Sequence, residues 1–252
     1  MKRAIVSAVL CSTILAGTSG ATAWPGWAQD ARDWAQSLAL SEDILDAPEA
    51  AVTRGQAVQL LYEVAGRPNA PADTPFTDVP ETYADATAWA AEQGFVEGLG
   101  DGKYQPERPL TRQEFAAMLY RSAGGPAVSG SELSAYTDAA SVADWAWDAV
   151  LWCSKIGLLN GRSNHLLAPE DTIILAEAVL ILQRDAQLPD TAQLQKDLET
   201  LSMQHHPIGS VGEQAAVQYL QSRFTEMGYL VSTQDYTNDA GQTGANVIAV
   251  KP

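Results

Sequence analysis

Residues 76–124, FTDVPETYADATAWAAEQGFVEGLGDGKYQPERPLTRQEFAAMLYRSAG, contain two helical patterns separated by a glycine-rich loop. The same layout returns 63 residues further on, with five identities at one constant offset. Trp89, Gly94, Gly98, Pro106 and Glu114 correspond to Trp152, Gly157, Gly161, Pro169 and Glu177. A constant offset across five positions indicates an internal repeat. A repeat is a stronger indication of the architecture of a chain than any local sequence pattern.

Within residues 76–124, the spacing of apolar residues predicts a helix over residues 80–93 that buries Ala86, Trp89 and Ala90. Gly94 ends this helix, and the glycines that follow mark a tight loop. Thr111 is the expected N-cap of a second helix, and Glu114 three residues later completes a capping box. This second helix is expected to run to Arg121 and to bury Phe115, Met118 and Leu119.

Two further segments carry the same pattern in weaker form. Residues 136–185 keep the first helix and both loop glycines, but Ile174 and Leu175 stand where the preceding repeat has Thr111 and Arg112. Residues 24–68 lack the loop glycines, yet residues 53–56 (TRGQ) preserve the start of the second helix. Each helix pair has an apolar face that it cannot bury alone, so the chain is expected to stack three units around a common core.

Residues 76–124 resemble the S-layer homology (SLH) module, whose pattern runs F-x-D-V, aromatic, G-hydrophobic-hydrophobic-x-G, D-G-x-aromatic-x-P and T-R-x-E. The resemblance implies a mainly α fold, with three helix-loop-helix repeats (24–68, 76–124 and 136–185) in a pseudo-threefold bundle. It also implies a function. Such modules hold secreted proteins non-covalently on a secondary cell-wall polysaccharide of bacteria, typically a pyruvylated one.

In SLH proteins the arginine of T-R-x-E lies in a groove between repeats and meets the acidic wall sugar. The resemblance therefore assigns this role to Arg54 and Arg112, with Thr111 beside the latter. A guanidinium suits the task because it forms paired, charge-assisted bonds with a planar carboxylate. The alternative for Arg112 is an ordinary surface ion pair with Glu107 or Glu114. The loss of the arginine at Leu175 predicts at most two working grooves.

Other candidate contacts to the polysaccharide are Trp89, Asp101 and Lys103. Trp89, like Trp152, could stack on a sugar ring, but its helical spacing among alanines equally fits a core position. Asp101 and Lys103 could bind sugar hydroxyls, whereas turn formation alone would also explain the Asp101-Gly102 pair.

After a linker at residues 186–192, residues 193–252 are expected to form a small α/β fragment. The pattern predicts helices over 191–203 and 211–227, and strands over 229–236 and 246–251. Residues 205–252 resemble the opening of the di-zinc aminopeptidase domains related to aminopeptidase S. That resemblance implies zinc ligands and a general base downstream of the N-V-I-A strand, beyond Pro252, so no catalytic residue and no cofactor is assigned to this chain. His205 and His206 are interpreted as a polar start of the helix and not as a metal site. The segment is expected to be a truncated domain or a remnant.

Residues 1–23 have the pattern of a secretory signal, with Lys2 and Arg3 before an apolar run and a small-x-small site at residues 21–23. The chain contains 15 basic and 31 acidic residues. Loss of the two basic residues changes its net charge from −16 to −18. This acidity argues against nucleic acid and anionic membranes as partners, because both bind clustered Lys and Arg. Cys153 would remain as a single cysteine, expected to be a packing residue and not a nucleophile.

The sequence therefore predicts a secreted protein at the cell wall or cell surface that anchors by binding polysaccharide. The alternative is the amino-terminal part of a surface-tethered zinc aminopeptidase, in which the repeats serve as the tether. A third hypothesis is a structural protein of a surface array.

Overall fold

The computed structural model describes residues 23–188, 191–202, 207–226 and 229–250. The predicted signal segment and the His205-His206 pair therefore lie outside the described residues, apart from Ala23. The chain divides into two compact units, residues 1–188 and 189–252. In the described ranges, no helix is long and apolar enough to cross a membrane.

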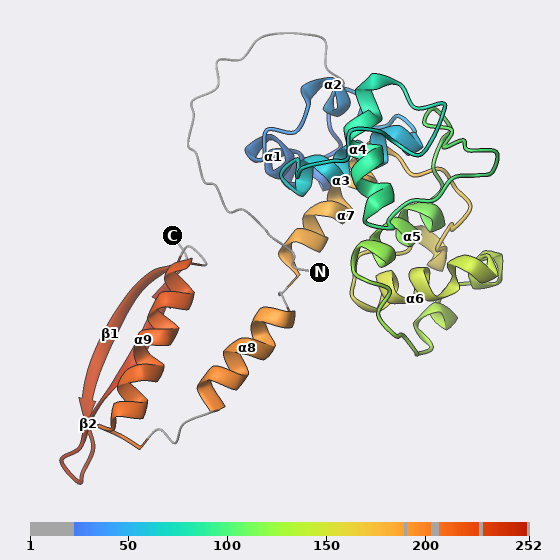
Figure 1. Ribbon diagram of the computed structural model, residues 1–252. Helices are drawn as coiled ribbons and strands as arrows, with labels where there is room; N and C mark the ends of the chain where they lie inside the picture. The colour runs from blue at the N-terminus through green and yellow to red at the C-terminus, as the bar shows by residue number, and fades with distance from the viewer. Residues whose placement is uncertain (1–22, 189–190, 203–206, 227–228, 251–252) are drawn as a thin grey trace. The chain divides into compact units, whose positions relative to one another are not determined.

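The first unit is built from helix pairs joined by irregular loops (Figure 1). Its α-helices are α1 (Gln29–Ser37), α2 (Glu42–Leu45), α3 (Arg54–Val64), α4 (Glu81–Glu92), α5 (Arg112–Ser122), α6 (Trp147–Lys155) and α7 (Leu175–Gln187). Short 3-10 segments are η1 (Gly26–Ala28), η2 (Glu132–Ala135), η3 (Ala139–Ser141), η4 (Asp144–Ala146) and η5 (Ser163–His165). The expected helices of the best-preserved repeat are α4 and α5, each within one residue of its predicted bounds.

The second helix of each repeat is α3, α5 or α7, and a threonine is the N-cap of the first two. Thr53 Oγ1 accepts a hydrogen bond from Gln56 N at 3.2 Å, and Gln56 Oε1 accepts one from Thr53 N at 3.0 Å. Thr111 and Glu114 form the same reciprocal pair at the start of α5. Ile174 precedes α7 and makes no side-chain cap. The predicted capping box of Thr111 and Glu114 is thus confirmed, and Thr53 and Gln56 form a second one at the helix start that residues 53–56 preserve. Both boxes fix where the helices begin.

The three repeats meet in a closed ring of backbone hydrogen bonds. Leu110 N donates to Val52 O at 2.9 Å, Ile173 N to Leu110 O at 3.0 Å, and Val52 N to Ile173 O at 2.9 Å. Each of these residues stands two positions before a second helix, and each is at most 1% exposed. Because each repeat donates to one neighbour and accepts from the other, the ring has pseudo-threefold symmetry.

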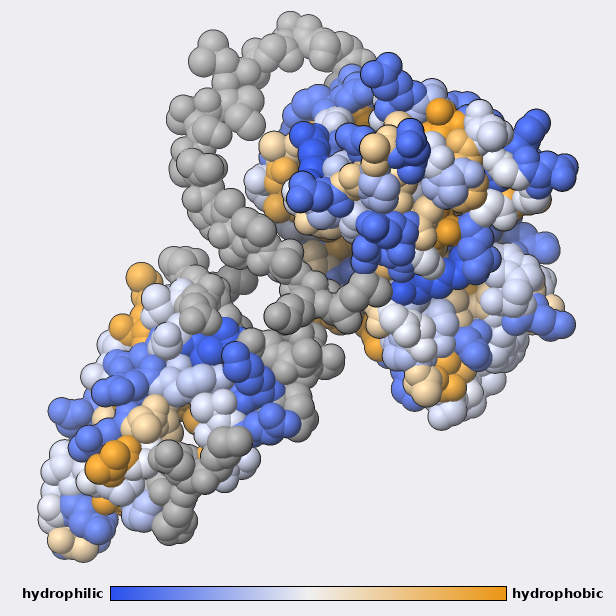
Figure 2. Space-filling model, viewed as in Figure 1, coloured by the Kyte–Doolittle hydropathy of each residue, from blue (hydrophilic) through white to orange (hydrophobic). Residues whose placement is uncertain are grey.

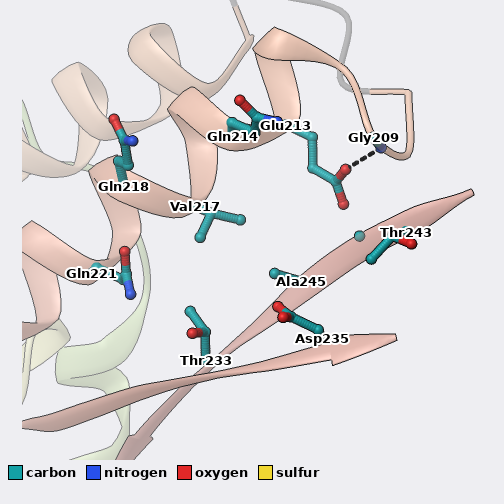
Figure 3. A pocket seen from close by; sticks show the side chains of 11 residues that line it. Gly209, Glu213, Gln214, Val217, Gln218, Gln221, Thr233, Asp235, Thr243 and Ala245 are labelled. Carbon is teal, nitrogen blue, oxygen red and sulfur yellow. Dashed lines mark hydrogen bonds between the residues drawn. The ribbon is translucent and has the colours of Figure 1, made fainter. Parts of the chain in front are cut away.

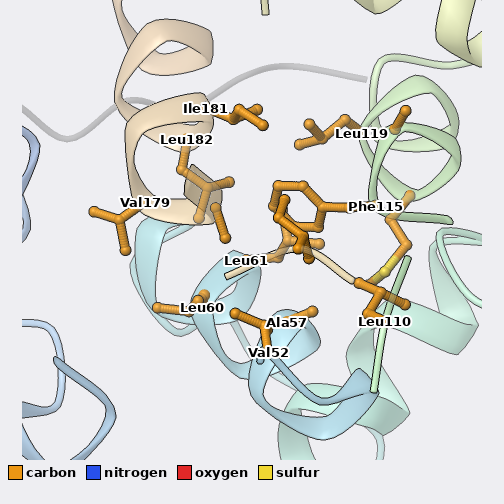
Figure 4. Close-up of a cluster of buried hydrophobic side chains, with 14 of the residues drawn as sticks. Val52, Ala57, Leu60, Leu61, Leu110, Phe115, Leu119, Val179, Ile181 and Leu182 are labelled. Atoms are coloured by element: carbon orange, nitrogen blue, oxygen red, sulfur yellow. The ribbon is translucent and has the colours of Figure 1, made fainter. Parts of the chain in front are cut away.

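Around this ring, α3 packs on α4, α5 on α6, and α7 on α1, so the last repeat closes onto the first. Figure 4 shows the core at the centre, where side chains from the three second helices converge on Phe115. The core members labelled there are Val52, Ala57, Leu60, Leu61, Leu110, Phe115, Leu119, Val179, Ile181 and Leu182, all less than 9% exposed. Cys153 is also buried, and burial raises the pKa of its thiol.

The F-x-D motif fastens each glycine loop to the start of its repeat. Asp78 accepts hydrogen bonds from Tyr104 N at 2.7 Å and Gln105 N at 2.9 Å. Asp138 accepts equivalent bonds from Leu167 N and Ala168 N, both at 2.7 Å. Desolvation opposes the charge on Asp78, but the two amide donors hold the pKa of its carboxyl below its usual value.

The second unit contains α8 (Thr191–Ser202), α9 (Val211–Glu226) and an antiparallel hairpin of β1 (Leu230–Thr237) and β2 (Thr243–Val250). The layout of two helices and two strands agrees with the prediction, although β2 begins three residues earlier than expected. The sequence of α9 predicts burial of Ala215, Ala216, Tyr219, Leu220 and Phe224, but Ala215 is exposed and the other four are only half-buried. A two-stranded sheet offers too little surface to cover a helix face completely.

Candidate ligand groove

Arg54 opens α3, and its side chain reaches from the first repeat into the loop of the second. Its Nε donates to Tyr104 O and its Nη2 to Glu97 O, both at 2.9 Å. The guanidinium carbon lies 4.4 Å from the centre of the Tyr104 ring, whose hydroxyl donates back to Arg54 O. Arg54 is only 7% exposed, and this burial lowers the pKa of its guanidinium.

Arg112 repeats this arrangement one unit further on. Its Nε donates to Leu167 O at 3.1 Å and its Nη2 to Asn160 O at 2.9 Å. These carbonyls lie 63 positions after those of Tyr104 and Glu97, so both arginines use the same two loop positions. Each arginine is therefore a bridge between neighbouring repeats, which a sequence pattern alone does not reveal.

The two arginines differ in their charged neighbours. Arg112 Nη1 lies 3.2 Å from Glu177 Oε2, and the Arg112 side chain is 3% exposed. This partner is neither of the two acids expected from the sequence. For Arg54, no carboxylate among the described residues comes within 4.0 Å. The Arg54 guanidinium is thus a buried cation held by carbonyls and a ring, with no described carboxylate in direct contact and with Glu114 acting on it only from a longer distance.

A groove with a volume of about 180 Å³ opens beside Arg54. One wall is the loop of residues 96–99, and another is the face of α5 that carries Glu114 and Arg121. Trp145, from η4 of the third repeat, completes the lining and is 60% exposed. Arg121 is partly exposed and lies 3.6 Å from Glu97. All three repeats therefore contribute to this surface, which combines two arginines, the glutamates Glu97 and Glu114, and an exposed indole.

The remaining predicted site residues lie elsewhere. Thr111 is occupied by its capping box. Trp89 is 9% exposed and packs between Tyr62 and Phe95, whose ring centroids lie 5.5 and 5.1 Å from its own. Trp89 is therefore a core residue, the alternative that its helical spacing among alanines favoured. Asp101 and Lys103 are exposed in the loop but do not line the groove. Asp101 has a φ of 52°, in keeping with the turn interpretation.

Trp145 and Arg121 were missed by the sequence reasoning. One signal was present for Trp145, because Trp27-Ala28 in the first repeat and Trp145-Ala146 in the third precede Asp30 and Asp148 at the same spacing. Trp27 is likewise exposed, at 55%. Arg121 carried no such signal, since an arginine in the last turn of a helix is common for electrostatic reasons.

The third inter-repeat position lacks both cations. Leu175 replaces the arginine of the helix start, and Glu63 stands where α5 has Arg121. The Glu63 carboxylate is buried and accepts hydrogen bonds from Ser41 N, Ser41 Oγ and Gln59 Nε2. This position therefore has a buried acid, which also pairs with Arg67, where the Arg54 groove has the cation Arg121.

The second unit has its own hollow, of about 380 Å³, between α9 and the hairpin. Val217, Thr233 and Asp235 point into it, while Glu213 is bonded to Gly209 N (Figure 3). Within the described ranges, no group of three or more His, Cys, Asp or Glu side chains is placed to hold a metal ion. The hollow brings together hydroxyls and carboxylates, without a nucleophile paired to a base.

Comparison with known proteins identifies the repeats. Residues 75–116 and 135–179 match the family model of the S-layer homology domain. The chain is 28% identical over 165 residues to an amylopullulanase of Thermoanaerobacterium thermosulfurigenes, which covers 62% of this chain and 9% of the relative. It is 30% identical over 118 residues to a cell surface protein of Thermoanaerobacter kivui, covering 45% and 15%.

A cellulosome-anchoring protein of Acetivibrio thermocellus is 24% identical over 148 residues, covering 56% of this chain and 33% of the relative. The chain thus spans a third or less of the length of these relatives.

Proposed function

Because the chain carries S-layer homology domains, we propose that it is a cell-wall anchor that binds an acidic wall polysaccharide through the Arg54 groove. The domain and the cell-surface relatives point to the cell wall or cell surface as its location. One relative is named a cellulosome-anchoring protein, which supports attachment as the role of the shared region.

The observation that carries the proposal is the buried guanidinium of Arg54, which has no described carboxylate within 4.0 Å and lies beside an open groove. Two of its nitrogens are fixed by carbonyls, so the guanidinium is held in one orientation before a ligand arrives. A carboxylate that enters the groove gains a charge-assisted bond and relieves the cost of a buried charge without a counterion. A pyruvate ketal on a wall sugar supplies such a carboxylate.

The surroundings of Arg54 select a sugar and not a simple acid. Trp145 presents an exposed indole at the rim, and flat apolar ring faces are suited to stacking on pyranose rings. Arg121 adds a second cation. Hydrophilic side chains cover much of the face seen in Figure 2. The net charge of the whole chain is −16, so the chain as a whole repels an anionic polymer. Salt screens charges at long range, and these arginines therefore attract the polymer only over a short distance.

Co-sedimentation tests the ligand class. The whole chain is expected to pellet with native wall material and to stay in solution with walls stripped of their polysaccharide. An Arg54→Ala/Arg112→Ala double variant that is still folded by circular dichroism should lose retention on native walls. Binding to stripped walls would move the ligand to bare peptidoglycan, and unchanged retention of the double variant would refute the arginine assignment.

A second proposal concerns the role of the second unit. The observed order of α9, β1 and β2 agrees with the helix-strand-strand opening of the aminopeptidase domains that residues 205–252 resemble. In that case the repeats would tether a zinc peptidase whose ligands lie outside this sequence. The intact mass of the protein released from its native surface tests this, since a product larger by a few hundred residues is expected only for the tethered enzyme.

A further inference from the structure

The inter-repeat position beside Arg112, which corresponds to the Arg54 groove and is called the Arg112 groove below, already contains a carboxylate. Glu177, in the first turn of α7, accepts hydrogen bonds from Arg162 Nε at 3.2 Å and from Arg162 Nη2 at 2.9 Å. Arg112 Nη1 approaches the other oxygen of the same carboxylate at 3.2 Å. Glu177 therefore lies between two guanidinium groups, and its side chain is only 17% exposed.

The equivalent acid in the Arg54 groove is turned away. Glu114 occupies the position 63 residues before Glu177, but its Oε2 accepts the hydrogen bond of Thr111 N at 2.9 Å and its Oε1 pairs with Arg108. Glu114 thus belongs to the capping box of its own helix, and no described carboxylate lies within 4.0 Å of Arg54.

Three substitutions between the repeats account for this difference. Ile174 replaces the capping threonine, so no capping box holds Glu177 at the helix start. Arg162 stands where the second repeat has Leu99, and Asp171 where it has Arg108. Arg162 Nη1 pairs with Asp171 while its other nitrogens bind Glu177, which fixes the guanidinium over the groove.

We propose that Glu177 is a built-in ligand whose carboxylate fills the anion position of the Arg112 groove, so that only the Arg54 groove takes an external acidic sugar. The inference rests on the proposed function and adds its stoichiometry. An incoming carboxylate would have to displace Glu177 from two arginines and leave the Glu177 carboxylate unpaired. The free energy lost by unpairing this carboxylate exceeds the free energy gained from the new bond. The Glu63 carboxylate closes the third position in a comparable way.

The number of binding sites tests this inference. The probe is a monosaccharide that carries a 4,6-pyruvate ketal, titrated calorimetrically into the whole chain. The wild-type protein should bind one equivalent and Arg54→Ala none. Glu177→Gln, which keeps the size of the side chain but removes its charge, should bind a second equivalent. Glu177→Gln/Arg112→Ala should return to one, which places the gained site at Arg112.

Glu170→Gln is the control, because it removes one charge from an exposed acid of the same repeat as Glu177 that does not line the Arg54 groove, and it should leave the number of sites at one. If Glu177→Gln fails to fold, Arg162→Leu removes one of the two holding arginines and should also admit a second equivalent. Two sites in the wild-type protein, or one site in the folded Glu177→Gln and Arg162→Leu variants, would overturn the inference while the anchoring proposal stands. No binding at all to the wild-type protein would instead contradict the proposed acidic sugar.

Discussion

The guanidinium of Arg54 has two roles that a sequence motif does not separate. Its bonds to Tyr104 O and Glu97 O join the first repeat to the second, and the proposal assigns its remaining nitrogen to the ligand. Arg112 makes the same two kinds of carbonyl bond but spends its remaining nitrogen on Glu177. Two arginines in the same motif therefore differ in their charged neighbours, and the proposal assigns them different functions because of one carboxylate.

Trp145→Ala should weaken binding of the pyruvylated sugar about tenfold, or about 1.4 kcal/mol, because the exposed indole lines the groove without serving the core. Trp147→Ala is the matched control, since Trp147 is also exposed, at 42%, but does not line the groove. Calorimetric titration measures both. Equal losses in the two variants would show that the indole of Trp145 makes no specific contact.

Gly98→Ala should destabilise the first unit by about 1 to 3 kcal/mol, the usual cost of overpacking. A Cβ there would lie 2.9 Å from the Phe76 ring and 3.0 Å from Lys103 O. Urea denaturation followed by tryptophan fluorescence measures the effect. Gly26→Ala, where no atom lies within 4 Å of the added carbon, is the control and should be nearly neutral.

At the scale of elements, the helices that sequence predicted best are those with a clear apolar period, and α5 has an N-cap as well. α4 and α5 were located almost to the residue, because Thr111, Glu114 and the spacing of Phe115, Met118 and Leu119 agree. The ring formed by Val52, Leu110 and Ile173 could not be predicted, since apolar residues before a helix do not reveal which backbone they pair with. The carboxylate that occupies the Arg112 groove was equally hidden, because it comes from the helix of the following repeat.

Thr111→Ala should destabilise the first unit by about 1 kcal/mol, the typical cost of losing an N-cap. Thr111→Ser retains the accepting oxygen and should recover most of that loss. Thermal denaturation of both variants checks the expectation. An alanine variant as stable as the wild-type protein would show that the capping box is not limiting for α5.

The clamp between Asp78 and the glycine loop should make stability depend on pH. The pKa of Asp78 is lowered in the folded state, so its stabilisation is complete above the unfolded-state value of about 3.9 and is lost as the pH falls through the folded-state value. Asp78→Asn should therefore cost about 1 kcal/mol at pH 7. The difference from the wild-type protein should shrink below pH 3. Urea titrations at several pH values measure it, and a pH-independent difference would contradict the account.

At the scale of the whole molecule, the first unit is one closed assembly of three repeats. The last helix of the third repeat packs on the first helix of the first, and the backbone ring joins all three. Sequence predicted three repeats and a small α/β segment correctly. The sequence could not predict which groove is open to a ligand. Each groove is lined by side chains from several repeats, and a single substitution can fill it.

Residues 23–188 should fold without the second unit, because the ring and the core lie within the first unit. The melting temperature of this fragment should match that of the corresponding transition in the whole chain. Calorimetry compares the two, and a fragment that melts without cooperativity would show that the first unit depends on residues 189–252.

The most direct test of the account compares two single variants, Arg54→Ala and Arg112→Ala, for their dissociation constants on native wall polysaccharide. Both remove two arginine bonds to loop carbonyls. Arg112→Ala also removes the ion pair with Glu177, so circular dichroism at the assay temperature is used to confirm that each variant is folded. The account predicts that Arg54→Ala weakens binding by about a hundredfold, or about 2.7 kcal/mol, while Arg112→Ala changes it less than about threefold. Equal losses, or a greater loss in Arg112→Ala, would contradict the assignment of the Arg54 groove as the binding site.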